Sequence, residues 1–503
     1  MNTRAARAPI ANPGKFYIDG KWVAPSTPHM IDVIEAATEE LYFTVAQAET
    51  ADVARAVEVA RRAFDEGPWP RMSPRQRAQY LRAFAQAMTK RFDDVVQLWP
   101  RETGVIARIV PAVMEEVPAA FNYYADLAEA YPFEQEVPTS SGQGFGMIVG
   151  EPVGVVGAII PWNTPMHLAA WKLAPALLAG CAVVVKASPE APGAAYIIAE
   201  IADQIGLPPG VVNVLTADRV ASEALVTDHR VDKITFTGST NVGKRIAGIM
   251  AERVGRYTLE LGGKSAAIIL DDMDIAEVAD ILTGGACFVS GQICASLTRI
   301  IVPGHRHDEM LEALADRFSR IKIGNPFDGS VQMGPLASRR QRERVEGYIQ
   351  IGKDDGATLA FGGKRPKGLD RGWFVEPTVF GNVDNGSRIA QEEIFGPVIS
   401  VIAAADEDDA IRIENDSVFG LNASVFTHDV DKAWAVSRRL RTGTVGQNGN
   451  RADFGIGFGG FKQSGIGREG GVAGLLPYLE NKTVVLNQRP CPPMGEERAG
   501  RGA

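Results

Sequence analysis

Hydrophobic positions follow two different periods along the chain. After Thr50, and again after Ser73-Pro74, apolar residues recur every three or four positions, which predicts two amphipathic helices. From residue 153 the pattern changes to short apolar runs at 154–160, 182–186, 211–215 and 234–236, with helical stretches between them at 166–179, 192–206, 218–227 and 241–254. Strands that are buried on both faces and alternate with helices predict a parallel sheet in an α/β domain.

The same alternation returns later and indicates a second α/β unit. Strands are expected at 298–302 and 395–401, and helices at 306–321 and 336–354. Between the first helices and the first apolar run, residues 130–144 are rich in Pro, Ser and Gly, and 145–149 reads as a strand. A strand that leaves a helical region in this way can pair with another subunit.

Composition restricts the class of protein. A chain of 503 residues is too long for one simple core, and its 45% hydrophobic and 22% charged residues are ordinary for a soluble protein. The net charge of −9 and the lack of a Lys/Arg run argue against nucleic-acid binding. We expect no signal peptide, no membrane span and, from the spacing of 4 Cys and 6 His, no metal site. A cytoplasmic location is expected.

Two residues between 259 and 299 suggest chemistry on a carbonyl group. Glu260 lies between two leucines and before Gly262-Gly263, and apolar surroundings raise the pKa of a carboxyl toward that of a general base. Cys294 follows Gly291-Gln292-Ile293, and a thiol is a good nucleophile near neutral pH. Taken alone, a lone Cys is more often a small buried hydrophobe and such a Glu a loop acid.

Other candidate site residues lie at predicted strand ends. Phe236-Thr237-Gly238-Ser239 leads from a strand into a helix, which suits a pyrophosphate at the helix N-terminus or serves as an ordinary N-cap. Asn163 and Lys186 follow two other strands at the edge where open α/β sheets bind ligands. Asn163 could donate to an oxyanion, and both could equally be turn or capping residues.

These segments together resemble the NAD(P)-dependent aldehyde dehydrogenase superfamily over residues 15–488. The motifs that carry the resemblance occur in one order: Pro161-Trp162-Asn163, Phe236-Thr237-Gly238-Ser239, Glu260-Leu261-Gly262-Gly263-Lys264, Gly291-Gln292-Ile293-Cys294, Glu393-Ile394-Phe395-Gly396-Pro397 and Phe458-Gly459-Gly460. The resemblance implies an α/β fold with a Rossmann-like cofactor domain (1–129 and 153–262), an α/β catalytic domain (263–478), a β-strand oligomerisation arm (130–152 and 479–490) and a disordered tail (491–503).

The resemblance also implies catalytic roles. Cys294 is expected to add to the aldehyde, and Asn163 with the Cys294 N–H to form the oxyanion hole. Glu260 is expected to activate the water that hydrolyses the thioacyl enzyme. Lys172 and Glu469 match a proton relay.

Cofactor, substrate and partners follow from the same resemblance. NAD is expected, with NADP open because Pro189 stands where NAD-preferring members often carry Glu, with Glu190 next to it. A homodimer or homotetramer is expected. The cofactor residues are Ile159, Pro161, Trp162, Lys186, Ser188, Glu190, Phe236, Thr237, Gly238, Ser239, Val242, Leu261, Gly262, Gln341, Arg344, Glu393 and Phe395.

The substrate is expected to be a medium-size apolar or aromatic aldehyde. The expected wall is Met166, His167, Leu168, Trp171, Ile293, Ala295, Phe454 and Phe458. A semialdehyde, through Arg451, and a trimethylammonium aldehyde, through Trp171, are alternatives. Glu260 argues against a CoA-acylating enzyme. A cysteine hydrolase and a non-catalytic member are the alternatives from other classes.

Overall fold

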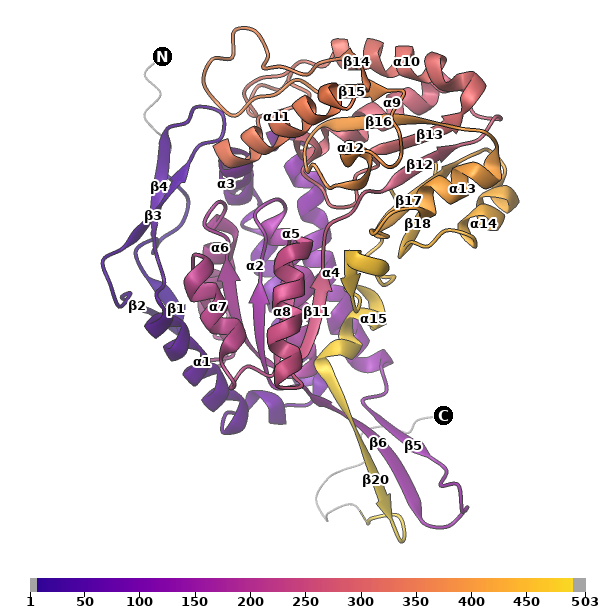
Figure 1. The fold of residues 1–503 in the computed structure, drawn as a ribbon. Helices are drawn as coiled ribbons and strands as arrows, with labels where there is room; N and C mark the ends of the chain where they lie inside the picture. Colours follow the sequence, from indigo (N-terminus) through magenta and orange to yellow (C-terminus); the bar gives the residue numbers. More distant parts are fainter. Residues whose placement is uncertain (1–6, 492–503) are drawn as a thin grey trace.

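The computed structural model describes residues 7–491, which include two large sheets covered by helices and two smaller sheets (Figure 1). The first sheet has the order β19 (Gly465–Ile466), β11 (Arg256–Glu260), β10 (Lys233–Thr237), β7 (Val155–Ile159), β8 (Ala182–Ala187), β9 (Val212–Thr216), β1 (Phe16–Ile18) and β2 (Lys21–Val23). Its strands β11, β10, β7, β8 and β9 are parallel. The apolar runs predicted all of these except β11.

Helices cover both faces of this sheet. One face packs on α2 (Pro74–Thr89), α3 (Phe92–Thr103), α4 (Val110–Ala130), α5 (Pro165–Ala179) and α6 (Gly193–Gln204). The other face packs on α1 (Thr50–Asp65), α7 (Arg219–Thr227) and α8 (Thr240–Glu252). The amphipathic pattern predicted α1 and α2 and did not indicate α3 and α4.

The second sheet has the order β14 (Thr358–Phe361), β15 (Thr378–Gly381), β16 (Val398–Ala404), β13 (Arg299–Pro303), β12 (Ala266–Ile269), β17 (Asn422–Phe426) and β18 (Thr444–Gln447). It carries α9 (Ile275–Cys287), α10 (His307–Ser319), α11 (Arg339–Asp354), α12 (Arg388–Gln391), α13 (Glu407–Asn415) and α14 (Val430–Ser437). The expected second α/β unit is therefore present.

The chain returns to the first unit before the arm begins. Strand β19 pairs with β11, and α15 (Gly471–Leu475) packs against α5. The range 263–478 therefore does not coincide with the second sheet, because its last residues lie on the first. The reason is that the edge strand β11 offers hydrogen-bonding groups that a later segment can satisfy.

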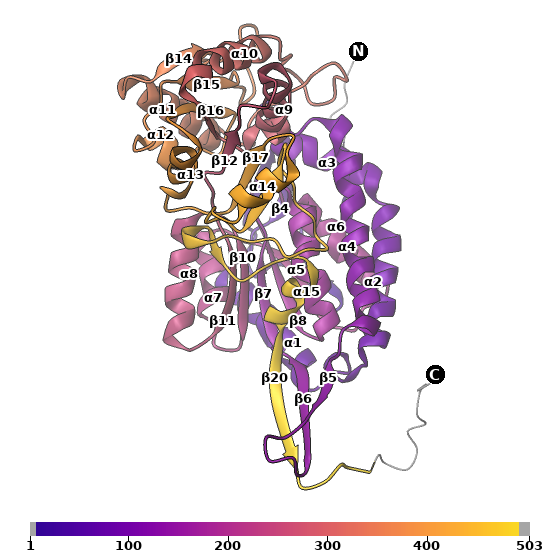
Figure 2. The ribbon, with the colours of Figure 1, turned by 90° about the vertical axis from the view of Figure 1, so that its right-hand side faces the viewer.

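The arm is a three-stranded antiparallel sheet that projects from the end of the first unit, away from the second (Figure 2). It consists of β20 (Leu479–Leu486), β6 (Phe145–Pro152) and β5 (Glu134–Val137), with Leu479 opposite Pro152 and Leu486 opposite Phe145. A separate hairpin joins β3 (Met30–Ile34) and β4 (Leu41–Ala46). Of the expected tail, residues 492–503 lie outside the described part of the chain.

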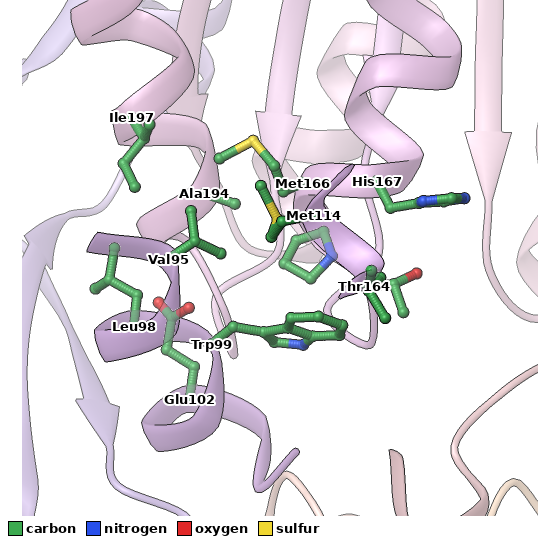
Figure 3. A pocket seen from close by; sticks show the side chains of 12 residues that line it. Val95, Leu98, Trp99, Glu102, Met114, Thr164, Met166, His167, Ala194 and Ile197 are labelled. Atoms are coloured by element: carbon green, nitrogen blue, oxygen red, sulfur yellow. The ribbon is translucent and has the colours of Figure 1, made fainter. Parts of the chain in front are cut away.

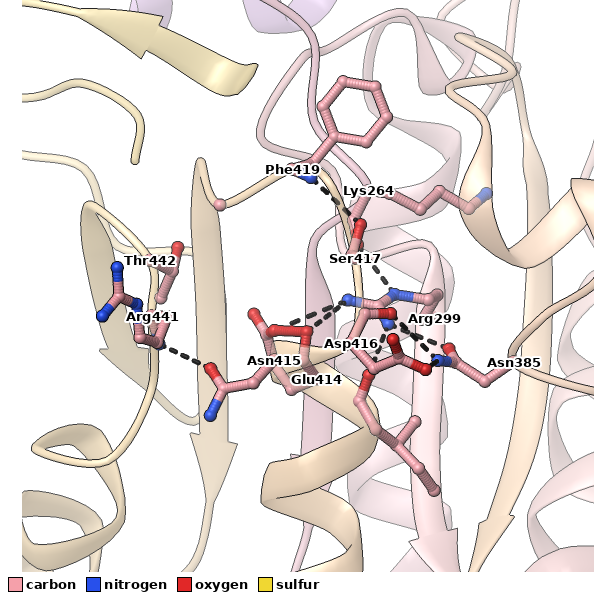
Figure 4. Close-up of polar contacts among 12 residues, drawn as sticks. Lys264, Arg299, Asn385, Glu414, Asn415, Asp416, Ser417, Phe419, Arg441 and Thr442 are labelled. Carbon is pink, nitrogen blue, oxygen red and sulfur yellow. Dashed lines mark hydrogen bonds and ion pairs between the residues drawn. The ribbon is translucent and has the colours of Figure 1, made fainter. Parts of the chain in front are cut away.

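One buried arginine fixes the crossover between the two sheets (Figure 4). Arg299, which is 1% exposed, donates from Nε to the carbonyl of Lys264 at 2.8 Å and from Nη1 to Asn385 Oδ1 at 3.0 Å. It also donates to the carbonyls of Ile413 at 2.9 Å and Glu414 at 3.1 Å. These bonds hold the segment that follows Glu260 against β13 and α13.

Among the described helices, none is both long and apolar enough to cross a membrane.

Candidate active site

The candidate residues meet at the carboxyl edge of the first sheet. Thr237 and Glu260 are the last residues of β10 and β11 and lie side by side in the parallel register. Lys186 is near the end of β8, and Asn163 follows β7. This is the edge at which open α/β sheets bind ligands.

Cys294 follows a turn with an unusual backbone. Val289, Ser290 and Gly291 have φ angles of +46°, +54° and +72°, the left-handed region that a β-branched residue rarely adopts. The buried Gln292 side chain pins this turn, since Nε2 donates to the Val289 carbonyl at 3.0 Å and Oε1 accepts from Ala337 N–H at 2.9 Å. Cys294 is therefore carried on a rigid support.

Beyond Cys294, the carbonyl of Ala295 is held from the opposite side. It accepts hydrogen bonds from Asn422 Nδ2 at 3.0 Å and Asn450 Nδ2 at 3.2 Å. The loop is thus fixed both before and after the thiol, which keeps a nucleophile in a reactive position.

Asn163 is aimed at the same loop. It is 5% exposed, and its Nδ2 donates to the carbonyl of Gln292 at 3.0 Å. Trp99 Nε1 donates to the Asn163 carbonyl at 2.8 Å and so fixes the backbone of this residue. The second hydrogen on Nδ2 has no acceptor within the described part of the chain. Trp99 lies 64 positions earlier, and no local pattern in the sequence indicated it.

Glu260 is buried without a hydrogen-bond partner. It is 4% exposed, and neither carboxylate oxygen is hydrogen-bonded within the described part of the chain. Burial, together with the charge of Glu469, raises the pKa of Glu260 well above its usual value, whereas Lys172 and Arg468 lower it. A carboxylate whose pKa is raised and whose oxygens have no protein partner is suited to accept a proton from water.

Lys172 and Glu469 are in contact beside this carboxyl. They form an ion pair in which both side chains are almost fully buried, and Lys172 Nζ also donates to Thr237 Oγ1 at 2.7 Å. The structure therefore places both residues next to Glu260.

The thiol itself is held in its protonated form. Burial and the charges of Glu393 and Glu260 raise the pKa of Cys294 to about 12, against the opposing effect of nearby backbone N–H groups. A positive charge bound beside Glu393 would lower this pKa.

One group of candidate cofactor residues surrounds Lys186. This lysine is 8% exposed, and burial lowers its pKa to about 8, although the charges of Glu190 and Asp218 oppose the change. Glu190 accepts from Ser188 Oγ at 2.5 Å and from Arg340 Nη2 at 2.9 Å. A carboxylate therefore lies near Lys186 although residue 189 is proline.

The turn before α8 forms a narrow cradle. A Cβ on Gly238 would lie 2.5 Å from the ring of Phe236, and one on Gly243 would lie 2.5 Å from Leu261. Ser239 precedes α8 and makes no side-chain cap bond, so N–H groups at this 13-residue helix remain free for an anion. The other candidates at this edge are Ile159, Pro161, Thr237 and the exposed Val242.

The opposite wall of the cofactor region comes from the second unit. Trp162 and Phe395 meet edge to face at 5.4 Å. Gln341 Nε2 donates to the Phe395 carbonyl at 2.6 Å, and Arg344 Nε donates to the Ile394 carbonyl at 3.2 Å. Gln341 and Arg344 thus hold the backbone of this loop.

Glu393 crosses back to the first unit. Its Oε1 accepts from the N–H of Gly263 at 3.1 Å, and a Cβ on Gly262 would lie 2.5 Å from Oε2. Burial raises the pKa of Glu393 to about 7. A buried lysine, an open helix N-terminus and this buried carboxyl together fit a dinucleotide.

The expected substrate wall is largely assembled. The His167 and Trp171 rings lie 4.9 Å apart, and Trp171 and Phe458 are 5.8 Å apart. Phe454 packs on Tyr123 at 5.8 Å. The remaining partly or fully buried candidates are Leu168, Ile293 and Ala295.

Met166 is 3% exposed. It lines a cavity of about 10 Å³ between α3, α4, α5 and α6, together with Trp99, Glu102 and Met114 (Figure 3). His167 borders the same cavity. The place of Met166 in the substrate wall stays a prediction. Within residues 7–491, no cluster of three His, Cys, Asp or Glu side chains could hold a metal.

Comparison with known proteins agrees with this geometry. Residues 22–484 match the model of the aldehyde dehydrogenase family. The chain is 42% identical to geranial dehydrogenase of Castellaniella defragrans over 94% of this chain and 98% of that protein. It is 37% identical to betaine aldehyde dehydrogenase of Bacillus subtilis, over 95% and 98%.

A solved structure shows the same fold. Mycobacterium tuberculosis aldehyde dehydrogenase, complexed with NAD+, superimposes with a TM-score of 0.92 at 44% identity and covers 94% of this chain and 98% of its own. The resemblance in the sequence and the fold class are both confirmed. The chain belongs to the aldehyde dehydrogenase family.

Proposed function

We infer that the protein oxidises an aldehyde to its carboxylic acid with NAD+ as the hydride acceptor. The observation that carries this is the meeting of Cys294, Asn163 and the unpaired Glu260 at one sheet edge. The family membership and the NAD+ bound by the M. tuberculosis relative support it. Intact Cys294, Asn163 and Glu260 argue against a non-catalytic member.

The chain's own residues supply the first half of the reaction. The cofactor would be held by Lys186, the α8 N-terminus and Glu393, and when bound it accepts hydride from the substrate carbon. Cys294 loses its proton to solvent and adds as the thiolate to the aldehyde carbonyl, and the oxyanion is stabilised by Asn163 Nδ2 and the Cys294 N–H. Re-formation of the carbonyl breaks the C–H bond, expels the hydride and leaves a thioester on Cys294. A single such donor contributes about 2.7–4 kcal/mol in other enzymes.

Glu260 carries the second half. It takes a proton from the water that attacks the thioester carbon, and cleavage of the C–S bond releases the carboxylic acid and the Cys294 thiolate. The proton leaves Glu260 toward the neighbouring Lys172–Glu469 pair. A cysteine hydrolase would not need the cradle before α8 or the Glu393 contact.

The lining favours a medium-size apolar or aromatic aldehyde. The rings of His167, Trp171 and Phe458 are consistent with this, and the 42% identical relative is named for the terpenoid aldehyde geranial. Burial lowers the pKa of His167 to about 4, so that ring is neutral. A semialdehyde fits less well, because the Glu116 carboxylate lies 3.4 Å from His167 Nδ1 and Arg451 is exposed.

A trimethylammonium aldehyde is the second candidate. Glu116 is the observation that favours it, since a carboxylate at an aromatic-lined mouth attracts a cation. The B. subtilis relative is named betaine aldehyde dehydrogenase. The aromatic wall does not form a complete cage, which favours the neutral aldehyde.

For the cofactor, NAD is preferred over NADP in this proposal. Glu190 is fixed by Ser188 and Arg340 near Lys186, where its charge would oppose a 2′-phosphate. The arm supports assembly into a homodimer or homotetramer, because its edge strands offer unpaired backbone groups. We place the enzyme in the cytoplasm.

The test is a panel of aldehydes assayed with NAD+ and NADP+ by absorbance of the reduced nicotinamide. Geranial, octanal and benzaldehyde represent the apolar class, betaine aldehyde the cationic class and succinic semialdehyde the anionic class. We expect reduction of NAD+ with the apolar class first. Absence of reduction with every aldehyde, in a protein that binds NAD+, would contradict the enzymatic proposal.

A further inference from the structure

Strand β10 carries polar side chains at every second position although it is buried on both faces. Lys233, Thr235 and Thr237 are 1%, 0% and 8% exposed, and they alternate with the core residues Ile234 and Phe236. Buried parallel strands are normally apolar throughout. Three polar residues on one face must therefore be satisfied by one another or by neighbours.

The adjacent strand continues this polar face to the catalytic base. In the parallel register Thr235 is opposite Thr258, and Thr237 is opposite Glu260. Partners in a parallel register point to the same face of a sheet. Glu260 is therefore the last residue of a row of polar side chains that begins at Lys233 on β10 and continues on β11. Within β11, Glu260 lies two residues, or about 7 Å, beyond Thr258.

Hydrogen bonds link the row to residues that pack on it. Lys233 Nζ donates to Thr258 Oγ1 at 2.7 Å and lies 5.2 Å from the ring centre of Tyr478. Thr235 Oγ1 donates to Glu469 Oε1 at 3.3 Å. We name this set the buried polar layer: Lys172, Lys233, Thr235, Thr237, Thr258, Glu260 and Glu469.

The layer holds two lysines and two glutamates, each at most 4% exposed. Lys172 and Glu469 form a direct ion pair. Glu260 has no hydrogen-bond partner, and Lys233 has no ion pair within residues 7–491 and donates only to a neutral hydroxyl. One carboxyl and one amine are thus left without a direct counter-ion in the same layer.

We propose that Lys233 is a positioning residue for Glu260. The charge of Lys233 is the second positive charge of the layer, and it balances the layer when Glu260 is a carboxylate. It acts through Thr258 and through the Lys172–Glu469 pair, and it touches neither substrate nor cofactor. The inference rests on the proposed role of Glu260 as the base.

The charges of Lys172 and Glu469 influence the pKa of both Lys233 and Glu260. Burial lowers the pKa of Lys233 to about 7; the charges of Cys181, Glu469 and Glu480 raise it, and that of Lys172 lowers it further. Glu260 is influenced by Glu469, Lys172 and Arg468, and it in turn raises the pKa of Cys294. Tyr478 lies against Lys233, and burial raises its pKa well above the usual value, so it remains neutral.

Loss of the Lys233 charge would leave the layer with one more carboxylate than lysine. Glu260 would then keep its proton to a higher pH. Glu260 acts as a base only when it is ionised. As the pH is lowered, the variant without the Lys233 charge would therefore lose activity at a higher pH than the parent. The expected displacement is about one pH unit for a charge in the same buried layer.

The experiment compares kcat against pH for Lys233→Met, Lys233→Arg and the parent, with the burst of hydride transfer measured in the same samples. We expect Lys233→Met to keep the burst and to shift the acid limb of kcat upward by about one unit. Lys233→Arg should restore the parent limb. Lys90→Met removes an exposed lysine at the end of α2 and should leave the profile unchanged.

Two outcomes would overturn the proposal: an unshifted acid limb in Lys233→Met, or a uniform loss of kcat at every pH, as a purely structural role requires. Should Lys233→Met not fold, Thr258→Val removes the linking hydroxyl, and a smaller upward shift is expected. Full turnover in Glu260→Gln would instead remove the base itself, which separates failure of the proposed function from failure of this inference.

Discussion

Two buried charged residues lie on either side of the crossover between the sheets. They differ in the number of hydrogen-bond partners that each one has. Arg299, on the second sheet, uses its guanidinium to bind Lys264, Asn385, Ile413 and Glu414. Glu260, on the first sheet, is equally buried and binds nothing within the described residues. Only three residues, 261–263, separate it from Lys264, whose carbonyl Arg299 binds.

The difference separates a structural charge from a functional one. A buried charge that is fully hydrogen-bonded contributes to a unique packing, and its removal leaves the partners unsatisfied. A buried carboxyl without a partner costs stability and persists where chemistry needs it. We therefore expect substitutions of the first kind to reduce stability, and those of the second kind to reduce turnover.

The largest effect is expected at the nucleophile. Cys294→Ala should lower kcat by about four orders of magnitude or more, because no other group can form the thioacyl enzyme. NAD+ binding, measured by calorimetry, and the melting temperature should be retained. The matched control is Cys287→Ala, a buried thiol at the end of α9 outside the site, which should remain active. Residual turnover close to that of the parent would remove Cys294 from the mechanism.

Glu260→Gln is expected to have the second-largest effect, and it tests the buried carboxyl that has no hydrogen-bond partner. Hydride transfer should still give a burst, whereas steady-state turnover should fall about 10²–10⁴-fold, since the amide cannot accept the proton of water. The melting temperature should stay the same or rise, because an unpaired carboxyl is removed. A marked loss of stability in this variant would contradict the distinction drawn between the two charges.

Arg299→Met tests the buried charge that is hydrogen-bonded. It leaves Glu414, which is 2% exposed, without its guanidinium neighbour at 3.6 Å. The free energy of unfolding should fall by about 3–5 kcal/mol, measured by urea denaturation. Arg320→Met breaks an ion pair whose arginine is 69% exposed, and it should change stability by less than about 1 kcal/mol. Equal effects of the two substitutions would contradict a special role for Arg299.

The smallest effect is expected at the mouth of the substrate site. Burial and the charge of Asp453 raise the pKa of Glu116, which lies 3.4 Å from His167. Glu116→Gln should raise kcat/KM for succinic semialdehyde about tenfold, because a like charge is removed, and should leave octanal unchanged. The control variant is Glu115→Gln, which removes the same charge from the preceding residue of α4, an exposed position. An equal gain in that control would indicate a general surface effect.

Much of the fold follows from the periodicity of the sequence. The apolar runs located β7, β8, β9 and β10, and their fully buried patterns explain why they were visible. Strand β19 was not visible, because it has only two residues and no periodicity. The arm was expected to consist of residues 130–152 and 479–490, and the structure pairs their strands β6 and β20 with each other.

The candidate site was predictable where a short motif carries the chemistry. Glu260, Cys294 and Asn163 each lie in a recognisable local context, so their order along the chain identified them. Trp99 and Lys233 carry no such context. Their interest comes from partners that are distant in sequence or on another strand.

The sequence by itself determined the fold class, the family and the identity of the reactive groups, because hydrophobic period and motif order are local properties of the chain. Only the tertiary structure decided which buried charges are satisfied, since hydrogen-bond partners such as Ile413 for Arg299 are brought close by folding alone. It also decided that Met166 and His167 line a cavity together with Trp99 and Met114, which come from other helices. These outcomes depend on packing between elements, which no single segment encodes.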